Sequence, residues 1–360
     1  MRLPLLAPLL PLLACPDETG DKVGGLDSGD VVCDRIHGAT GILKYGYDDA
    51  GTAESEDDAW SVHFPNTAPD GLTRTTGVSG PLSDGVTLVA LFGGRLLVST
   101  DDGCTWDDDG GVLPSTGDWL LNAQGSTLYA FDRASSAGGF SKDDGASWTA
   151  TEASEPFVGL PVADASVAGK LRGVQARGVV TTDDDGTNWD VSGTVPSGTL
   201  VGAAVWPGGL DTIVAATTEG VYLSRTAGTA WDDIGASLIT AGITPSRVAI
   251  HPSNADVIWT AGSDENGGVI EATTNAGASW KPVAAQRNVD LDPAAALWPD
   301  PNEADVLLSH FDVADGDGSV TMYRFFSGNI ESHIVSTYRG LSDIAFLPDG
   351  SWIAGVDSVP

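Results

Sequence analysis

Short runs of apolar and β-branched residues, separated by glycine-rich segments, recur along most of the chain. Gly85-Val-Thr-Leu-Val-Ala-Leu-Phe92 is followed by Arg95-Leu-Leu-Val-Ser99, and Thr212-Ile-Val-Ala-Ala216 is followed by Gly220-Val-Tyr-Leu-Ser224. Each run has the length and composition of a β-strand, and the glycines between the runs are typical of turns. The pattern predicts an all-β protein that consists of short strands and tight turns.

An eight-residue pattern that ends in tryptophan follows these runs and occurs five times. The first copy is Ser99-Thr-Asp-Asp-Gly-Cys-Thr-Trp106, and the later copies begin at residues 141, 182, 224 and 273. Successive copies therefore start 42, 41, 42 and 49 residues apart. A fixed period of this length indicates a repeat architecture, and strand-rich repeats of forty-odd residues are typical of four-stranded propeller blades. The sequence predicts a β-propeller.

The repeated pattern resembles the Asp-box, or BNR repeat, Ser-x-Asp-x-Gly-x-x-Trp, found in sialidases, sortilin-type receptors, some glycosidases and the photosystem II assembly factor. The resemblance implies a turn between the third and fourth strands of each blade, on the face away from the ligand. Within it Asp caps backbone amides, Gly takes a positive φ and Trp packs beneath the turn. In the later copies Thr226 and Asn275 replace Asp and can form similar hydrogen bonds. The positions that match the box are Ser99, Asp101, Gly103, Trp106, Ser141, Asp143, Gly145, Trp148, Thr182, Asp184, Gly186, Trp189, Ser224, Gly228, Trp231, Thr273, Asn275, Gly277 and Trp280.

Both ends of the chain contain strand-like segments that do not complete a blade. Residues 47–51 match the front of a box without its tryptophan, and a sixth repeat near residues 319–328 has no box. Residues 341–355 supply two strands, and residues 31–64 supply others. Joining the two ends in one shared blade would leave no open sheet edge. We therefore expect one domain over residues 31–360 with seven four-stranded blades; the alternative is six blades, with residues 31–64 packed outside.

The chain is strongly acidic. Its 360 residues include 50 Asp and Glu against 17 Lys and Arg, a formal charge of −33. A protein with so few cations would release few counterions on binding a polyanion, which argues against nucleic acid as a partner. The 46 glycines argue against a helical protein. The negative charge is expected to keep the protein soluble; attraction of cationic partners or divalent ions is the alternative.

The N-terminal residues resemble an export signal. Residues 1–14 contain one arginine and then only apolar residues and prolines. Leu12-Leu13-Ala14-Cys15 resembles the bacterial lipobox, which is cut before an invariant cysteine. The resemblance implies that Cys15 becomes an acylated N-terminus and that acyl chains such as palmitate tether the protein to a bacterial membrane, inner or outer. An ordinary secretory signal is the alternative. The low apolar content of residues 15–30 predicts a flexible acidic tether.

Two cysteines remain if Cys15 carries lipid, namely Cys33 and Cys104. Such a pair in an oxidising compartment predicts a disulfide, and two separately buried thiols are the alternative. In the expected ring, Cys33 would lie in the shared blade and Cys104 in the box turn of the next blade. The bridge would therefore join neighbouring blades.

No motif of sialidase chemistry is complete. Sialidases resemble one another in a Phe/Tyr-Arg-Ile-Pro motif that carries the first of three carboxylate-binding arginines, and the nearest match here is Asp34-Arg35-Ile36-His37. Tyr338 and Arg339 could supply a later tyrosine and arginine, but nothing in the sequence places a glutamate beside them. A two-carboxylate glycosidase stays open, because abundant Asp and Glu offer many pairs.

One acidic loop could bind a metal. Asp312, Asp315 and Asp317 share one loop with Gly316 and Gly318 and offer oxygen ligands suited to Ca²⁺, but they lack EF-hand spacing. A solvated loop is the alternative. The five histidines are scattered, so no zinc site is expected, and no cofactor is required.

These observations leave two classes of function. We expect a non-catalytic, membrane-tethered, monomeric propeller that binds a protein or a glycan through loops at one mouth of the ring. The alternative is an exported glycosidase, either sialidase-like or of the two-carboxylate type. The side chains in the central channel should distinguish them: a converging carboxylate pair or an arginine cluster favours catalysis, whereas Thr, Val and Gly favour binding.

Overall fold

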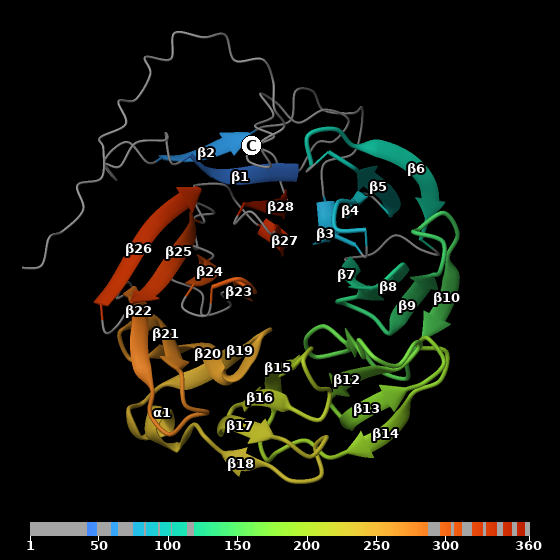
Figure 1. Cartoon of the computed structure of the whole chain (residues 1–360). Helices are drawn as coiled ribbons and strands as arrows, with labels where there is room; N and C mark the ends of the chain where they lie inside the picture. Colours follow the sequence, from blue (N-terminus) through green and yellow to red (C-terminus); the bar gives the residue numbers. More distant parts are fainter. Residues whose placement is uncertain are drawn as a thin grey trace, which may run out of the picture. The chain divides into compact units, whose positions relative to one another are not determined.

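The computed structural model describes residues 42–48, 59–63, 75–82, 84–92, 94–101, 103–113, 119–286, 296–303, 306–311, 319–326, 329–336, 341–347 and 351–356. All of them belong to a compact unit of residues 31–360. Within these ranges the strands form seven antiparallel sheets of four strands each. Figure 1 shows the sheets following one another around a ring. The prediction of an all-β propeller is confirmed.

The first four blades each contain four strands that are consecutive in the chain. Blade 1 contains β3 (Thr75–Ser79), β4 (Leu88–Phe92), β5 (Arg95–Ser99) and β6 (Asp107–Val112). Blade 2 contains β7 (Trp119–Gln124), β8 (Thr127–Asp132), β9 (Ala137–Ser141) and β10 (Thr149–Glu152). Blade 3 contains β11 (Val162–Ala163), β12 (Leu171–Gln175), β13 (Gly178–Thr182) and β14 (Asp190–Gly193). Blade 4 contains β15 (Leu200–Val205), β16 (Ile213–Thr217), β17 (Gly220–Ser224) and β18 (Asp232–Asp233), which precedes α1 (Ala236–Thr240).

The remaining three blades complete the ring. Blade 5 contains β19 (Thr244–His251), β20 (Asn254–Asp264), β21 (Gly267–Thr273) and β22 (Lys281–Gln286). Blade 6 contains β23 (Ala296–Pro299), β24 (Val306–Phe311), β25 (Ser319–Phe326) and β26 (Asn329–Ser336). Blade 7 contains β27 (Leu341–Phe346), β28 (Trp352–Val356), β1 (Ile42–Asp48) and β2 (Ala59–His63).

Blade 7 is the shared blade that the sequence predicts. Its two inner strands come from the C-terminal part of the chain and its two outer strands from the N-terminal part. β1 pairs with β28 in antiparallel register, with Ile42 opposite Gly355 and Tyr45 opposite Trp352. This pairing closes the ring without a covalent link between the two ends, and it leaves the edges of β1 and β28 covered.

Neighbouring blades contact one another mainly through their inner strands, and blade 3 contacts blade 4 through its second strand, β12. β27 contacts β3, β3 contacts β7, β7 contacts β11, β12 contacts β15, and β15 and β23 both contact β19. Blades 6 and 7 are joined where the Asn302 side-chain amide donates a hydrogen bond of 3.1 Å to the Leu347 carbonyl. The inner strands therefore form the wall of a central channel.

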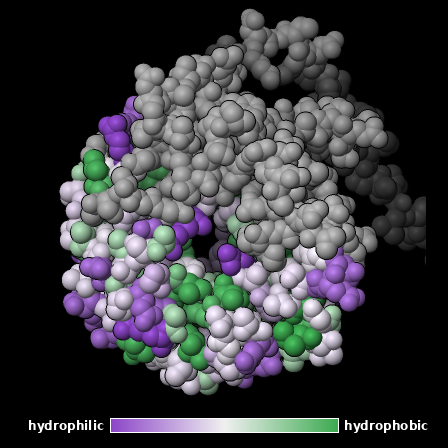
Figure 2. All heavy atoms as spheres, turned by 180° about the vertical axis from the view of Figure 1, so that it is seen from behind, coloured by the Kyte–Doolittle hydropathy of each residue, from purple (hydrophilic) through white to green (hydrophobic). Residues whose placement is uncertain are grey.

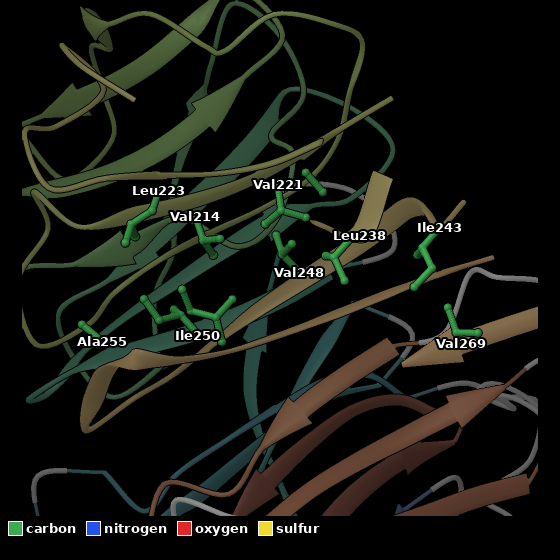
Figure 3. Close-up of a cluster of buried hydrophobic side chains, with 11 residues drawn as sticks. Val214, Val221, Leu223, Leu238, Ile243, Val248, Ile250, Ala255 and Val269 are labelled. Atoms are coloured by element: carbon green, nitrogen blue, oxygen red, sulfur yellow. The ribbon is translucent and has the colours of Figure 1, made fainter. Parts of the chain in front are cut away.

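The hydrophobic core is divided into layers between successive blades. Between blades 4 and 5, Val214 and Val221 meet Val248 and Ile250, and the buried Leu238 of α1 belongs to the same layer (Figure 3). Similar buried clusters lie between blades 7 and 1 and between blades 1 and 2. The sheets of blades 1–5 are buried on both faces, which explains the nearly continuous apolar character of their central strands. Within the described ranges, no helix has the length and apolar character needed to cross a membrane.

Candidate binding site

The five repeated turns lie between the third and fourth strands of blades 1–5, where the sequence places them. In the first copy, the Ser99 hydroxyl donates to Asp101 over 2.9 Å and accepts a hydrogen bond of 2.9 Å from the Gly103 amide. The Thr105 amide then donates to the Asp101 carboxylate over 2.8 Å. Two side chains thus satisfy the backbone amides that this tight turn leaves without a partner.

The two copies without aspartate keep the same turn. The Ala230 amide donates to the Thr226 hydroxyl over 3.0 Å, and the Ser279 amide donates to the Asn275 side-chain oxygen over 2.9 Å. A hydroxyl or amide oxygen is therefore sufficient for the cap. Because a carboxylate is dispensable at this position, the repeated aspartates are explained by turn geometry.

The turns also join each blade to the one before it. Gly145 has φ +94°, and a Cβ atom there would lie 1.9 Å from a methyl carbon of Leu96 in blade 1. The Trp231 indole donates to the Thr194 carbonyl of blade 3 over 3.0 Å. The Trp280 indole donates to the Ile234 carbonyl of blade 4 over 2.6 Å. The repeated residues thus have a structural role at the contacts between blades.

A cavity of about 570 Å³ occupies the channel. Its walls come from the inner strands and adjoining loops of blades 2–7. One face of the ring is hollowed at its centre, where hydrophobic and hydrophilic residues lie side by side (Figure 2). The volume lies within the range of small-molecule and peptide-binding pockets. The channel is therefore the candidate site.

Most of the cavity wall is apolar. The strand β15 contributes Leu200-Val-Gly-Ala-Ala-Val205, and β19 contributes Val248, Ala249 and Ile250. In blade 3 the inner strand β11 is only two residues long, and the preceding segment from Phe157 to Leu160 forms part of the wall. These side chains favour an apolar or extended ligand. Four charged side chains interrupt this surface: Asp132, Arg133, Arg247 and Asp343.

Asp343 is half-buried and lines the cavity. Its carboxylate accepts hydrogen bonds from the amides of Val78 in blade 1, over 3.3 Å, and of Ile344, over 3.0 Å. Burial raises the pKa of Asp343 to about 6, although the Arg133 charge and hydrogen bonding from the Trp298 indole oppose this rise. Blades 1, 2 and 6 therefore all act on one carboxylate of blade 7.

The other charged groups are held by local contacts. The Asp132 carboxylate caps the turn after β8, since it accepts hydrogen bonds from the Ala134 amide over 3.1 Å and the Ser135 hydroxyl over 2.6 Å. Arg133 donates to the Ser342 carbonyl of blade 7. Both channel carboxylates thus already accept hydrogen bonds from the protein.

Arg247 projects from the middle of β19. Its guanidinium donates to the carbonyls of Val201, over 3.2 Å, and Ser246, over 2.9 Å. None of the described carboxylates forms an ion pair with it. Arg247 therefore supplies a positive charge that the backbone holds in place and that no described carboxylate neutralises.

Several residues singled out in the sequence lie outside the described ranges: Cys15, Cys33, Arg35, Tyr338, Arg339, and the loop residues Asp312, Asp315 and Asp317. Lipidation and Ca²⁺ binding at these positions therefore stay predictions. Among the residues that the structure describes, no group of three His, Cys, Asp or Glu side chains is placed to hold a metal ion.

Cys104 is buried in the first repeated turn, where it is 7% exposed. Its sulfur is disulfide-bonded. Because Cys33 lies outside the described ranges, the pairing of Cys104 with Cys33 stays a prediction.

The channel residues were not predicted from the sequence. Arg133 follows the last residue of β8, Arg247 lies within β19, and Asp343 lies near the start of β27. These positions share no motif and come from blades 2, 5 and 7. The sequence offers one clue to them. Lysine and arginine are rare in this acidic chain, so an arginine on or near a predicted inner strand is a candidate for the channel wall.

No protein-family model matches the chain, and no curated protein matches it. Among solved structures it is similar to one described as YCF48 bound to D1 peptide, with a TM-score of 0.55 and 18% identity over 80% of this chain and 93% of that one. YCF48 from Cyanidioschyzon merolae is similar at a TM-score of 0.55 and 14% identity, over 80% of this chain and 97% of that one. The GH74 xyloglucanase from Xanthomonas campestris gives a TM-score of 0.55 and 14% identity, over 79% of this chain and 51% of that one. These similarities show the propeller fold.

Proposed function

We propose that this chain is a non-catalytic propeller that binds a segment of a partner protein in its central channel. The observation that carries the proposal is the state of the two described channel carboxylates. Asp132 caps a turn, and Asp343 accepts hydrogen bonds from the amides of Val78 and Ile344. A two-carboxylate glycosidase needs one group to donate a proton and another to attack or to activate water. The two aspartates are instead held in structural hydrogen bonds.

The cavity suits an extended peptide. Its wall combines aliphatic residues of β15 and β19 with a few fixed charges, and β15 and β19 are the edge strands of their sheets on the channel side. Such an edge can pair with an added strand, while neighbouring side chains provide selectivity. The similar structure of YCF48, which holds a D1 peptide, supports a peptide as the ligand class.

Site-specific photo-cross-linking in the bacterial envelope tests this proposal. A photoreactive amino acid replaces Leu160, which lines the cavity, or Val191, which is 54% exposed on the outer strand β14 and serves as the matched control. We expect discrete protein adducts from position 160 and none from position 191. Equal adducts at the two positions, or none at position 160, would contradict the proposal.

We also propose that the protein is a lipoprotein tethered to the bacterial membrane by acylated Cys15. The lipobox-like residues before Cys15 support this proposal. Cys15→Ser should abolish labelling by a fatty-acid analogue and release the protein from the membrane fraction. Cys33→Ser, which removes a different cysteine, should leave the label in place. Labelling that survives Cys15→Ser would exclude the lipid anchor.

A glycosidase is the second candidate, because a pKa of about 6 would suit Asp343 as a general acid. The GH74 xyloglucanase shares the propeller fold. Assays against aryl glycosides, aryl sialosides and xyloglucan decide between the two candidates. Turnover that Asp343→Asn abolishes would establish the glycosidase and overturn the binding proposal.

A further inference from the structure

The four charged side chains in the described part of the channel sum to zero at neutral pH. Arg133 and Arg247 contribute two positive charges, and Asp132 and Asp343 contribute two negative charges. The whole chain, by contrast, carries a formal charge of −33. At physiological salt, screening limits exposed charges to a range of about 8 Å. Among the described residues, these four groups are the charges that line the cavity around a ligand.

Asp343 is placed to change this balance. Its surroundings are the amide of Val78 on β3, the indole of Trp298 on β23 and the guanidinium of Arg133 after β8. Burial raises the pKa of Asp343 to about 6. Uptake of one proton by Asp343 leaves the described channel with a net charge of +1.

Arg247 is a second cation of the channel wall, and the backbone holds its position. Two backbone carbonyls, of Val201 and Ser246, hold one guanidinium nitrogen, and no described carboxylate neutralises the group. A guanidinium presents five N–H donors, so donors remain for a ligand carboxylate. A group that is already oriented loses little conformational entropy when the ligand binds.

We propose that the channel binds an anionic peptide segment and that proton uptake by Asp343 strengthens this binding. The inference rests on the proposed function and names its ligand class and its regulation. In the ionised state Asp343 supplies the negative charge that balances Arg133 and repels an incoming carboxylate. In the protonated state the ligand carboxylate supplies that negative charge instead. By reciprocal linkage, the bound peptide raises the proton affinity of Asp343.

Fluorescence anisotropy with the full exported chain in detergent tests this inference. The probe is a rhodamine-labelled (Gly-Asp)4 peptide, and the matched uncharged probe is (Gly-Asn)4. We expect the wild-type protein to bind (Gly-Asp)4 about fivefold more tightly at about pH 5.5 than at about pH 7.5. A change of this size follows if protonation of Asp343 raises the affinity for the peptide about tenfold. Binding of (Gly-Asn)4 should not change with pH.

Two variants assign the effect to Asp343. Asp343→Asn should bind (Gly-Asp)4 equally at both pH values, whereas Asp190→Asn, on the exposed outer strand β14, should keep the wild-type pH dependence. If Asp343→Asn fails to fold, carbon NMR of the wild-type carboxyl replaces it, and the probe should raise the pKa of Asp343. No binding of (Gly-Asp)4, equal wild-type affinity at both pH values, or pH dependence that persists in Asp343→Asn would overturn the inference. Cross-linking from position 160 would still report on the proposed function separately.

Discussion

Ionised aspartates in two regions of this propeller have opposite effects on the stability of the fold. The repeated turns between the third and fourth strands of blades 1–5 are called the rim below. In the rim, hydrogen bonding from the Ser147 side chain lowers the pKa of Asp143 below its ordinary value. In the channel, burial raises the pKa of Asp343 to about 6. The ionised rim aspartate therefore supports folding, while the ionised channel aspartate opposes it. A residue kept at a cost to stability marks a place where function has shaped the sequence.

The largest expected effect tests how much the rim contributes to the fold. Trp106 is 3% exposed, and its indole donates to the Gly103 carbonyl over 2.9 Å. Trp106→Ala should lower the free energy of unfolding by about 3–5 kcal/mol, measured by urea denaturation. The half-buried Trp148 has a buried indole nitrogen without a partner, so Trp148→Ala should cost less. Equal losses for the two variants would show that burial of the tryptophan does not decide its contribution.

The contact between blades at the rim predicts the next effect. A Cβ atom on Gly111 of β6 would lie 1.8 Å from the Gly145 carbonyl oxygen in the next blade. Gly111→Ala should therefore destabilise the fold by about 1–3 kcal/mol through forced backbone movement. Gly125 has φ +59° and open space around it, so that Gly125→Ala should show only the conformational cost, about 1 kcal/mol. A smaller loss for Gly111→Ala than for Gly125→Ala would contradict the close contact.

The rim and the channel should respond to pH with opposite signs. For Asp343 the folded pKa lies above the ordinary value, so stability falls as pH rises from about 4 through about 6. Asp343→Asn should therefore raise the free energy of unfolding at neutral pH by about 1–3 kcal/mol, and the gain should vanish near pH 4. Chemical denaturation across this pH range measures the effect.

For Asp143 the folded pKa is lowered, so its contribution is present above its ordinary pKa and is lost as pH falls through the folded value. Asp143→Asn should consequently destabilise the protein at neutral pH, and the difference should shrink in acid. If Asp343→Asn and Asp143→Asn shift stability in the same direction at neutral pH, the contrast between channel and rim is wrong.

The smallest expected effect concerns backbone strain at the rim. Ala227 has φ +55°, a conformation that costs an L-residue with a Cβ atom about 1 kcal/mol. Ala227→Gly should raise the free energy of unfolding by about 0.4–1 kcal/mol, whereas Ala230→Gly in the same turn should not. Thermal denaturation of both variants provides the comparison. A loss of stability in Ala227→Gly would mean that the strain is absent.

The sequence predicted the rim well because each repeat encodes its own turn. Ser99, Asp101 and Gly103 lie within five residues of one another, so their hydrogen bonds are local and their spacing alone indicates the blade. The shared blade followed from the strand-like segments at both ends. The helix α1 was not predicted; it follows a two-residue outer strand and covers an apolar layer between blades 4 and 5.

The channel could not be predicted in the same way. Arg133, Arg247 and Asp343 are separated along the chain by 114 and 96 residues, and only closure of the ring brings them around one cavity. No local pattern distinguishes these positions from surface charges. Their environment, which includes the amide of Val78 and the indole of Trp298, likewise comes from separate blades.

A carbon NMR titration of the carboxyl groups of Asp343 and Asp143 in one sample tests the contrast between channel and rim most directly. Resonances are assigned with Asp343→Asn and Asp143→Asn. Asp343 should titrate near pH 6, and Asp143 should titrate below its ordinary value, with both transitions in the folded protein. If both groups titrate together near pH 4, the channel carboxylate has no special environment, and the assignment of the channel as a functional site is contradicted.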